Sequence, residues 1–181
     1  MQLSAVIITH NEARNIGRCL DSLAGLADEV VVVDSFSTDD TEVICRAKGA
    51  RFIQRAFDGF AAQKNWANAQ ARFEYLLSLD ADEALSETLR ESVFFIKNNW
   101  KHSAYAVNRR TNYCGQWINH SGWYPDRKVR LFDRRKAEWG GPAVHEQLLL
   151  SEPSDVGFLH GDLLHYSYYT VAEHYARARK Y

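Results

Sequence analysis

The first hundred residues alternate between the apolar spacing of strands and that of helices. Short apolar runs predict strands at Leu3–Thr9, Glu29–Val33, Arg51–Gln54 and Tyr75–Leu79. The second run contains four consecutive valines, which is typical of a parallel strand that is covered on both faces. Each of these runs is short enough for a single strand across a small sheet.

Helices are predicted between these strands and after the last one. Apolar residues with i, i+3, i+4, i+7 spacing mark the first helix face: Ile16, Cys19, Leu20 and Leu23. Capping residues at 37–40 begin a second helix that continues to about Lys48, a third helix covers Phe60–Arg72, and Ser86 caps a fourth. The alternation predicts an α/β fold with a mostly parallel central sheet, flanked by helices and joined by right-handed crossovers.

The pattern changes beyond residue 103. From Ala104 to Trp139, aromatic and aliphatic residues are spread among polar ones, which predicts antiparallel or mixed strands, and Asp162–His165 is a further strand. Because no Pro- or Ser-rich linker intervenes, we expect one domain over 1–181, with halves of about 1–102 and 103–166 and a helix at 167–181. The pattern from Thr170 to Tyr181 has no stop signal, so we expect the natural protein to continue.

Composition limits the classes of function. The chain has 181 residues, of which 46% are apolar and 25% charged, as expected for one globular domain with a sizeable core. Its formal net charge of -1 provides no basic field, so binding to nucleic acid is not expected. Three scattered cysteines without a CxxC pair argue against a disulfide framework or a zinc site and favour a reducing compartment: Cys19, Cys45 and Cys114.

The sequence predicts a cytoplasmic protein. Its start lacks a basic leader, and the apolar stretch Ala5–Ile8 is far shorter than a membrane span or the core of a signal peptide. The basic and aromatic residues from Ala176 to Tyr181 favour a solvated helix face, with contact to an anionic membrane surface as the alternative.

Polar clusters follow three of the predicted strands, at Thr9–Glu12, Asp34–Ser37 and Asp80–Glu83. Helix capping explains any one of them. Because the carboxyl ends of parallel strands meet at one edge of a sheet, the three together predict a ligand site. Asp80 and Asp82 repel each other unless a cation lies nearby, which indicates a divalent metal and a phosphate-bearing ligand.

These segments, from Ala5 to Glu12, from Val31 to Asp39 and from Leu79 to Glu83, resemble those of the family 2 glycosyltransferases. The resemblance covers the first half of the chain in order, spacing and strand context. It implies a GT-A fold, the Rossmann-like fold of nucleotide-diphospho-sugar transferases, and a UDP-sugar donor with Mg or Mn as cofactor. The first half would then bind the nucleotide-sugar and the second half the acceptor.

The resemblance also implies roles for individual residues. Side chains after the first two strands would hold the uridine: Thr9, Asn11, Glu12 and Asp34. Asp80 and Asp82 would contact the metal and the diphosphate. The segment Gln63–Asn65 resembles a family segment close to the nucleotide, so Lys64 either places a cation beside the base or phosphates or is a solvated helix residue.

Three segments of the second half narrow the resemblance: Trp123–Asp126, Arg130–Phe132 and Gly140–Glu146. They are similar to bacterial enzymes that add a sugar, often glucose, to the heptose of the lipopolysaccharide inner core. The resemblance therefore implies an inverting hexosyltransferase with a saccharide acceptor, working in the cytoplasm or at the cytoplasmic face of the inner membrane.

Inverting transfer needs one carboxylate to take the proton of the acceptor hydroxyl. Glu146 is the first candidate, because the glycines before it allow close backbone approach to a ligand; a surface ion pair is the alternative. Asp126 is the second candidate, with a turn role beside Pro125 as the alternative. His165 is a further candidate metal ligand or a structural histidine, and His145 is placed to orient its neighbour.

Two other classes of function remain as alternatives. One is a non-catalytic module that binds a nucleotide-sugar or a glycan. The other is a haloacid-dehalogenase-type phosphatase, although its motif usually stands near the start of the fold and is followed by threonine, whereas Asp82 is followed by Glu83 and Ala84 here. A Rossmann dehydrogenase and a sugar nucleotidyltransferase are disfavoured, because no Gly-rich loop follows the first strand. Donor sugars differ by single hydroxyl groups, whose partners a sequence does not show.

Overall fold

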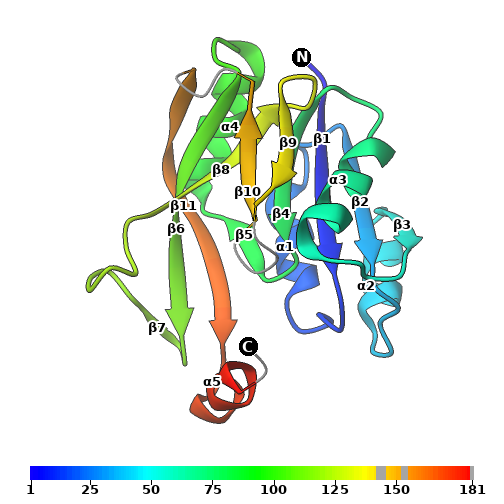
Figure 1. Cartoon of the computed structure of the whole chain (residues 1–181), viewed down its shortest axis with the longest axis vertical. Coiled ribbons are helices and arrows are strands. Elements are labelled where there is room, and N and C mark those ends of the chain that lie inside the picture. The colour runs from blue at the N-terminus through cyan, green and yellow to red at the C-terminus, as the bar shows by residue number, and fades with distance from the viewer. Residues whose placement is uncertain (142–145, 152–154, 180–181) are drawn as a thin grey trace.

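The computed structural model describes residues 1–141, 146–151 and 155–179 (Figure 1). Four parallel strands occupy the positions where apolar runs predict them: β1 (Leu3–Thr9), β2 (Glu29–Asp34), β3 (Arg51–Gln54) and β4 (Tyr75–Asp80). These predictions are confirmed, and the two carboxylates of the Asp80-Ala81-Asp82 sequence, a DxD motif, therefore stand at the end of a buried strand.

Four helices connect or follow these strands: α1 (Ile16–Leu23), α2 (Thr41–Ala47), α3 (Phe60–Gln70) and α4 (Glu87–Asn98). They confirm the predicted helices, although α3 ends at Gln70 rather than at Arg72. Ser86 caps α4 as predicted, because its Oγ accepts a hydrogen bond from the backbone N–H of Leu89 at 3.2 Å.

Strands dominate the second half, as its pattern predicts: β6 (Ala104–Tyr113), β7 (Gln116–Trp117), β8 (Asp126–Asp133), β9 (Ala137–Gly140), β10 (Gln147–Leu150) and β11 (Val156–Tyr168). β11 is much longer than the predicted strand Asp162–His165. The sequence pattern missed β5 (Glu83–Leu85), because three residues directly after the DxD motif are too few to show an alternation.

Within the described residues, nine strands form one sheet in the order β3-β2-β1-β4-β8-β6-β11-β5, with β7 paired to β6. The sheet is parallel from β3 to β4 and mixed beyond, since β8 is antiparallel to both of its neighbours. β9 and β10 form a separate two-stranded sheet. Figure 1 shows α5 (Val171–Ala178) beyond the ends of β6 and β11.

Apolar side chains form two clusters, one on each face of the sheet. Successive residues of β1 point to opposite faces, so Ile7 belongs to the cluster under α1 and α4, whereas Val6 belongs to the cluster under α3 and β9. The second cluster is closed by Phe132 and Trp139, whose rings meet edge to face. No helix in the described part of the chain is long and apolar enough to cross a bilayer.

A β-bulge interrupts the ladder between β6 and β8. Leu131 pairs with Tyr105 and Val129 pairs with Ala106, so Arg130 is an extra residue without a partner in β6. A bulge re-aims the side chain that it carries. The guanidinium of Arg130 consequently reaches the end of β4, where the predicted metal-binding motif lies.

Candidate functional site

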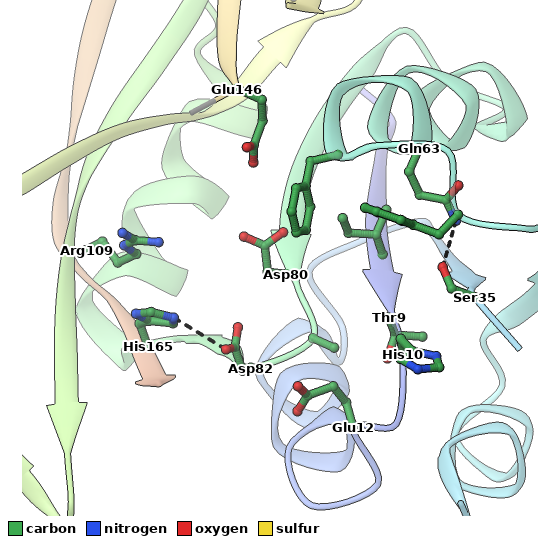
Figure 2. A pocket seen from close by; sticks show the side chains of 14 residues that line it. Thr9, His10, Glu12, Ser35, Gln63, Asp80, Asp82, Arg109, Glu146 and His165 are labelled. Carbon is green, nitrogen blue, oxygen red and sulfur yellow. Dashed lines mark hydrogen bonds and ion pairs between the residues drawn. The ribbon is translucent and has the colours of Figure 1, made fainter. Parts of the chain in front are cut away.

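A cavity of about 550 Å³ lies at the carboxyl ends of β1, β2 and β4. Figure 2 shows side chains from both halves of the chain that converge on it. The first half contributes Thr9, His10, Glu12, Ser35, Gln63, Asp80 and Asp82, and the second contributes Arg109, Glu146 and His165. The predicted meeting of three polar clusters at one sheet edge is therefore confirmed in part, since Asp34 does not line the cavity.

Asp80 is held between two cations. The ammonium of Lys64 lies 3.1 Å from its Oδ1, and Nη2 of Arg130 donates to its Oδ2 at 2.9 Å. Burial alone would raise the pKa of Asp80, but the charges of Lys64 and Arg130 outweigh it and hold that pKa far below its usual range. Asp80 is therefore a permanent carboxylate with both oxygens engaged.

Glu83 anchors Arg130 from the interior. Its carboxylate is fully buried, accepts from Arg130 Nη2 at 2.6 Å and accepts from the backbone N–H of Asp80 at 3.0 Å. Burial would lower the pKa of Arg130, yet the charges of Glu83 and Asp80 raise it above its ordinary value. The DxD motif is thus fixed by a buried ionic network.

Asp82 and His165 lie side by side at the cavity, as Figure 2 shows. His165 Nε2 lies 3.4 Å from Asp82 Oδ2, and the other ring nitrogen faces the hydroxyl of Thr111 at 3.3 Å. The backbone N–H of Tyr166 donates to Asp82 O at 2.9 Å, which ties β11 to the motif. One carboxylate oxygen and one imidazole nitrogen on the same cavity wall are suitable ligands for Mg or Mn.

These two side chains match the way hard divalent ions bind beside phosphates, with few protein ligands and the rest from substrate oxygens and water. The described residues contain no group of three or more His, Cys, Asp or Glu side chains that would enclose a metal without such help. The donor set therefore fits a metal that binds together with a diphosphate.

Glu146 forms a short ion pair with Lys64, at 2.8 Å. Lys64 is 2% exposed, lies 4.6 Å from the ring centroid of Trp139, and is not among the residues that line the cavity. The structure thus places Lys64 between Asp80 and Glu146, and the solvated interpretation of this lysine is wrong. The preceding residues 142–145, which include His145, lie outside the described residues.

Asp126 stands apart from the cavity wall. It accepts from Arg109 Nη2 at 2.7 Å and Nε at 3.0 Å, and Lys128 lies 3.1 Å away. Burial would raise the pKa of Asp126, but Arg109 and Lys128 lower it. Its partner Arg109, by contrast, points into the cavity (Figure 2).

The four residues expected around uridine divide into two pairs. Thr9 and Glu12 line the cavity, and Thr9 Oγ1 is buried without a hydrogen-bond partner among the described residues. Asn11 instead accepts from the backbone N–H of Thr38 at 2.8 Å. Asp34 is fully buried, and both of its oxygens accept from Ser37. Asn11 and Asp34 therefore fix the loops that shape the cavity.

Sequence reasoning missed the two arginines that complete the site. Arg109 and Arg130 lie on strands of the second half, and their carboxylate partners are distant in the sequence except for Asp126. Arg109 lies among polar residues of β6, so the only local signal is Arg130, a charged residue between Val129 and Leu131. Such residues are rarely buried unless they are paired.

Comparison with known proteins gives a consistent result. The family model described as glycosyl transferase family 2 matches residues 4–155. Uncharacterized glycosyltransferases of Rickettsia typhi and Rickettsia prowazekii are each 30% identical over 176 residues, which cover 92% of this chain and 60% of the relative. The lipopolysaccharide core biosynthesis glycosyltransferase LpsC of Rhizobium meliloti is 31% identical over 189 residues, covering 100% of this chain and 69% of LpsC. The chain thus spans about 60% of the length of the rickettsial relatives.

Solved structures show the same fold. Staphylococcus aureus TarS in complex with UDP superposes with a TM-score of 0.60 and 20% identity, covering 99% of this chain and 64% of the TarS chain. Glucosyl-3-phosphoglycerate synthase from Mycobacterium tuberculosis, in complex with Mn²⁺, UDP and glucosyl-3-phosphoglycerate, gives a TM-score of 0.50 and 23% identity, covering 63% and 44%. At these identities the likeness shows the fold alone, and it confirms the predicted fold class.

Proposed function

Because this chain belongs to the family 2 glycosyl transferases and has their GT-A fold, we propose that it transfers a hexose from a UDP-sugar with inversion. The proposed donor sugar is glucose, and the proposed acceptor is a saccharide such as the heptose of a lipopolysaccharide inner core. One observation carries the proposal: Asp82, His165 and Glu146, from three separate segments, line a single cavity. The similarity to LpsC supports the choice of acceptor.

We assign the donor to the side of the cavity formed by the first half of the chain. Thr9 and Glu12 would contact the uridine, on loops that Asn11 and Asp34 hold in place. Asp82 and His165 would hold Mg or Mn, which when bound neutralises negative charge on the diphosphate as it leaves. Asp80 keeps its place through Lys64 and Arg130.

We assign the proton transfer to Glu146. Its carboxylate takes the proton of an acceptor hydroxyl, whose oxygen forms a bond to the anomeric carbon while the bond between that carbon and the diphosphate oxygen breaks. Lys64 holds this carboxylate toward the cavity, where Figure 2 shows it opposite Asp80. Asp126 is the weaker candidate, because it does not line the cavity and is held instead by Arg109 and Lys128.

Two substitutions separate donor binding from transfer. Asp82→Asn should abolish Mn²⁺-dependent UDP binding, because it removes the anionic ligand from the proposed metal pair. Glu146→Gln should leave that binding intact and lower transfer by about 10²- to 10⁴-fold, the usual contribution of a general base. The measurements are calorimetric UDP binding with Mn²⁺, and UDP release from a panel of UDP-sugars with and without a heptose-bearing acceptor.

Glu138→Gln is the matched control, since Glu138 is exposed on β9 and lines neither this cavity nor the one next to it. It should change neither readout. Near-normal turnover of Glu146→Gln would refute the base assignment. Tight metal-dependent UDP binding without turnover, with every donor and acceptor, would instead identify a binding module.

A further inference from the structure

A second cavity, of about 440 Å³, adjoins the first. The two cavities share Asp80, Arg109 and Glu146, so the second opens beside the proposed base. Its remaining wall comes mainly from β8 and from the small sheet of β9 and β10. A molecule in this cavity would therefore lie next to the oxygen atoms of Glu146 on the acceptor side of the site.

Positive charge prevails around the second cavity. Five side chains in and around it are cationic: Lys64, Arg109, Arg127, Lys128 and Arg130. Four are carboxylates: Asp80, Glu83, Asp126 and Glu146. One positive charge is thus in excess among the described residues, although the chain as a whole has a formal net charge of -1.

The excess charge can be located on Arg127. The other four cations each form an ion pair with at least one of the four carboxylates. Arg127 forms no ion pair within the described ranges; it is exposed, and its guanidinium carbon lies 5.4 Å from the ring centroid of Phe158. An exposed cation at the rim of a cavity is available to a ligand.

Unsatisfied N–H groups belong to the same cavity wall. Arg130 Nε and Trp139 Nε1 are buried, and neither has a hydrogen-bond acceptor in the described part of the chain, yet both residues line this cavity. Arg109 Nη1 lies 3.7 Å from Glu83, which is too long for a hydrogen bond. Both atoms are too buried to touch a ligand in the cavity, so the preference for an anion rests on the exposed, unpaired charge of Arg127 and on Arg109 beside it.

We propose that the second cavity binds an oxyanion carried by the saccharide acceptor, with Arg127 as the residue that selects it. The inference rests on the proposed function, because it places the anionic group next to the hydroxyl that Glu146 deprotonates. A phosphate monoester and a carboxylate share the required chemistry, namely negative charge and several acceptor oxygens. The enzyme then prefers a charged acceptor to the same sugar without its charge.

The test compares three acceptors: a heptoside, the same heptoside with a phosphate monoester, and a heptoside linked to a uronic acid. In the wild type, kcat/KM for one of the charged acceptors should be about tenfold higher than kcat/KM for the neutral acceptor. Added salt should reduce this ratio of charged to neutral acceptor. Arg127→Glu should bring the ratio to one or below. Lys101→Glu, an exposed cation on the loop before β6 without an ion pair in the described ranges, should leave the ratio unchanged.

The phosphate arm and the uronic acid arm identify the source of the anion. Equal use of all three acceptors by the wild type, or a ratio that Arg127→Glu does not change, would overturn the inference while the proposed transfer stands. If no acceptor is turned over, the proposed function fails. In that case, calorimetry of the two charged heptosides tests the inference without catalysis. Binding that is lost in Arg127→Glu supports the inference, and the absence of binding by both heptosides refutes it.

Discussion

Lys64 joins the donor side of the cavity to the proposed base. It is almost completely buried, and its ammonium contacts both Asp80 and Glu146. Removal of one partner from a buried ion pair leaves uncompensated charge behind, which is usually more harmful than the loss of the whole pair. The side chain is therefore a positioning residue in the proposed mechanism.

Lys64→Met should lower the free energy of unfolding by about 3 kcal/mol, because two carboxylates lose a buried partner. It should also lower kcat while the donor KM stays within about twofold, since Glu146 loses the contact that orients it. Urea denaturation and steady-state kinetics below the melting temperature measure the two effects. A higher donor KM at unchanged kcat would instead mean that Lys64 contacts the nucleotide-sugar.

Lys97→Met is the matched control. Lys97 is 15% exposed and pairs with Asp28 at 2.7 Å, and neither residue lines either cavity. This variant should lose stability without a change in kcat. The comparison separates a general effect of breaking a partly buried ion pair from an effect on Glu146.

At the residue scale, the sequence reveals the motif but not its partners. Asp80 and Asp82 are recognisable because they follow an apolar run at short range. The contacts of Lys64 with Glu146 and of Arg130 with Asp80 join residues 82 and 50 positions apart, and they depend on tertiary packing and on the bulge at Arg130. Local spacing does not contain that information.

At the scale of elements, β11 and α4 approach each other through a glycine. Gly161 has φ +91°, and a Cβ at this position would lie 2.3 Å from the backbone nitrogen of Leu89. A positive φ strains any other residue, and a backbone neighbour cannot move aside as a side chain does. The same strand carries His165 to the cavity.

Gly161→Ala should therefore lower the free energy of unfolding by more than the ~1–2 kcal/mol expected from backbone strain alone. Because the clash also displaces β11, we expect weaker Mn²⁺-dependent UDP binding. Gly115→Ala is the control, since Gly115 has φ +86° but no atom within 4 Å of a Cβ. Equal losses in the two variants, measured by urea denaturation, would show that the approach to α4 has no energetic role.

The predictability of the elements differs between the two halves. The parallel strands and their helices follow from apolar periodicity, because each element repeats its own local pattern. In β11, Gly157, His160 and Gly161 interrupt the alternation, so most of this strand is missed. The order β4-β8-β6-β11-β5 depends on pairing between distant segments, which periodicity does not specify.

At the scale of the whole molecule, Tyr166 near the end of β11 and Tyr169 just before α5 contact the loop before α1 and the first turn of α1. The guanidinium carbon of Arg14 lies 3.2 Å from the ring centroid of Tyr169, and that of Arg18 lies 3.7 Å from Tyr166. The hydroxyl of Tyr169 donates to Asn15. These contacts connect the two halves of the chain on the side where Glu12 and His165 line the cavity.

Tyr169→Ala should lower the free energy of unfolding by about 1–3 kcal/mol, through the loss of a cation–π contact and a hydrogen bond. The rate of amide hydrogen exchange should increase in residues 166–174, and it should increase less in the strands of the central sheet. Tyr175→Ala is the control, because Tyr175 is on α5 and 67% exposed. Unchanged exchange in the Tyr169 variant would contradict a fastening role.

The bulge at Arg130 lets eight residues of β8 serve two chemically different surfaces. Asp126 and Lys128 pair with Arg109 and Val107 on one face, whereas Arg127 takes the other. Without the bulge, a regular ladder from Leu131 onward would reverse these faces and pair Arg127 with Arg109. The bulge absorbs that shift, so one strand presents the Asp126–Lys128 ion pair on one face and the unpaired charge of Arg127 on the other.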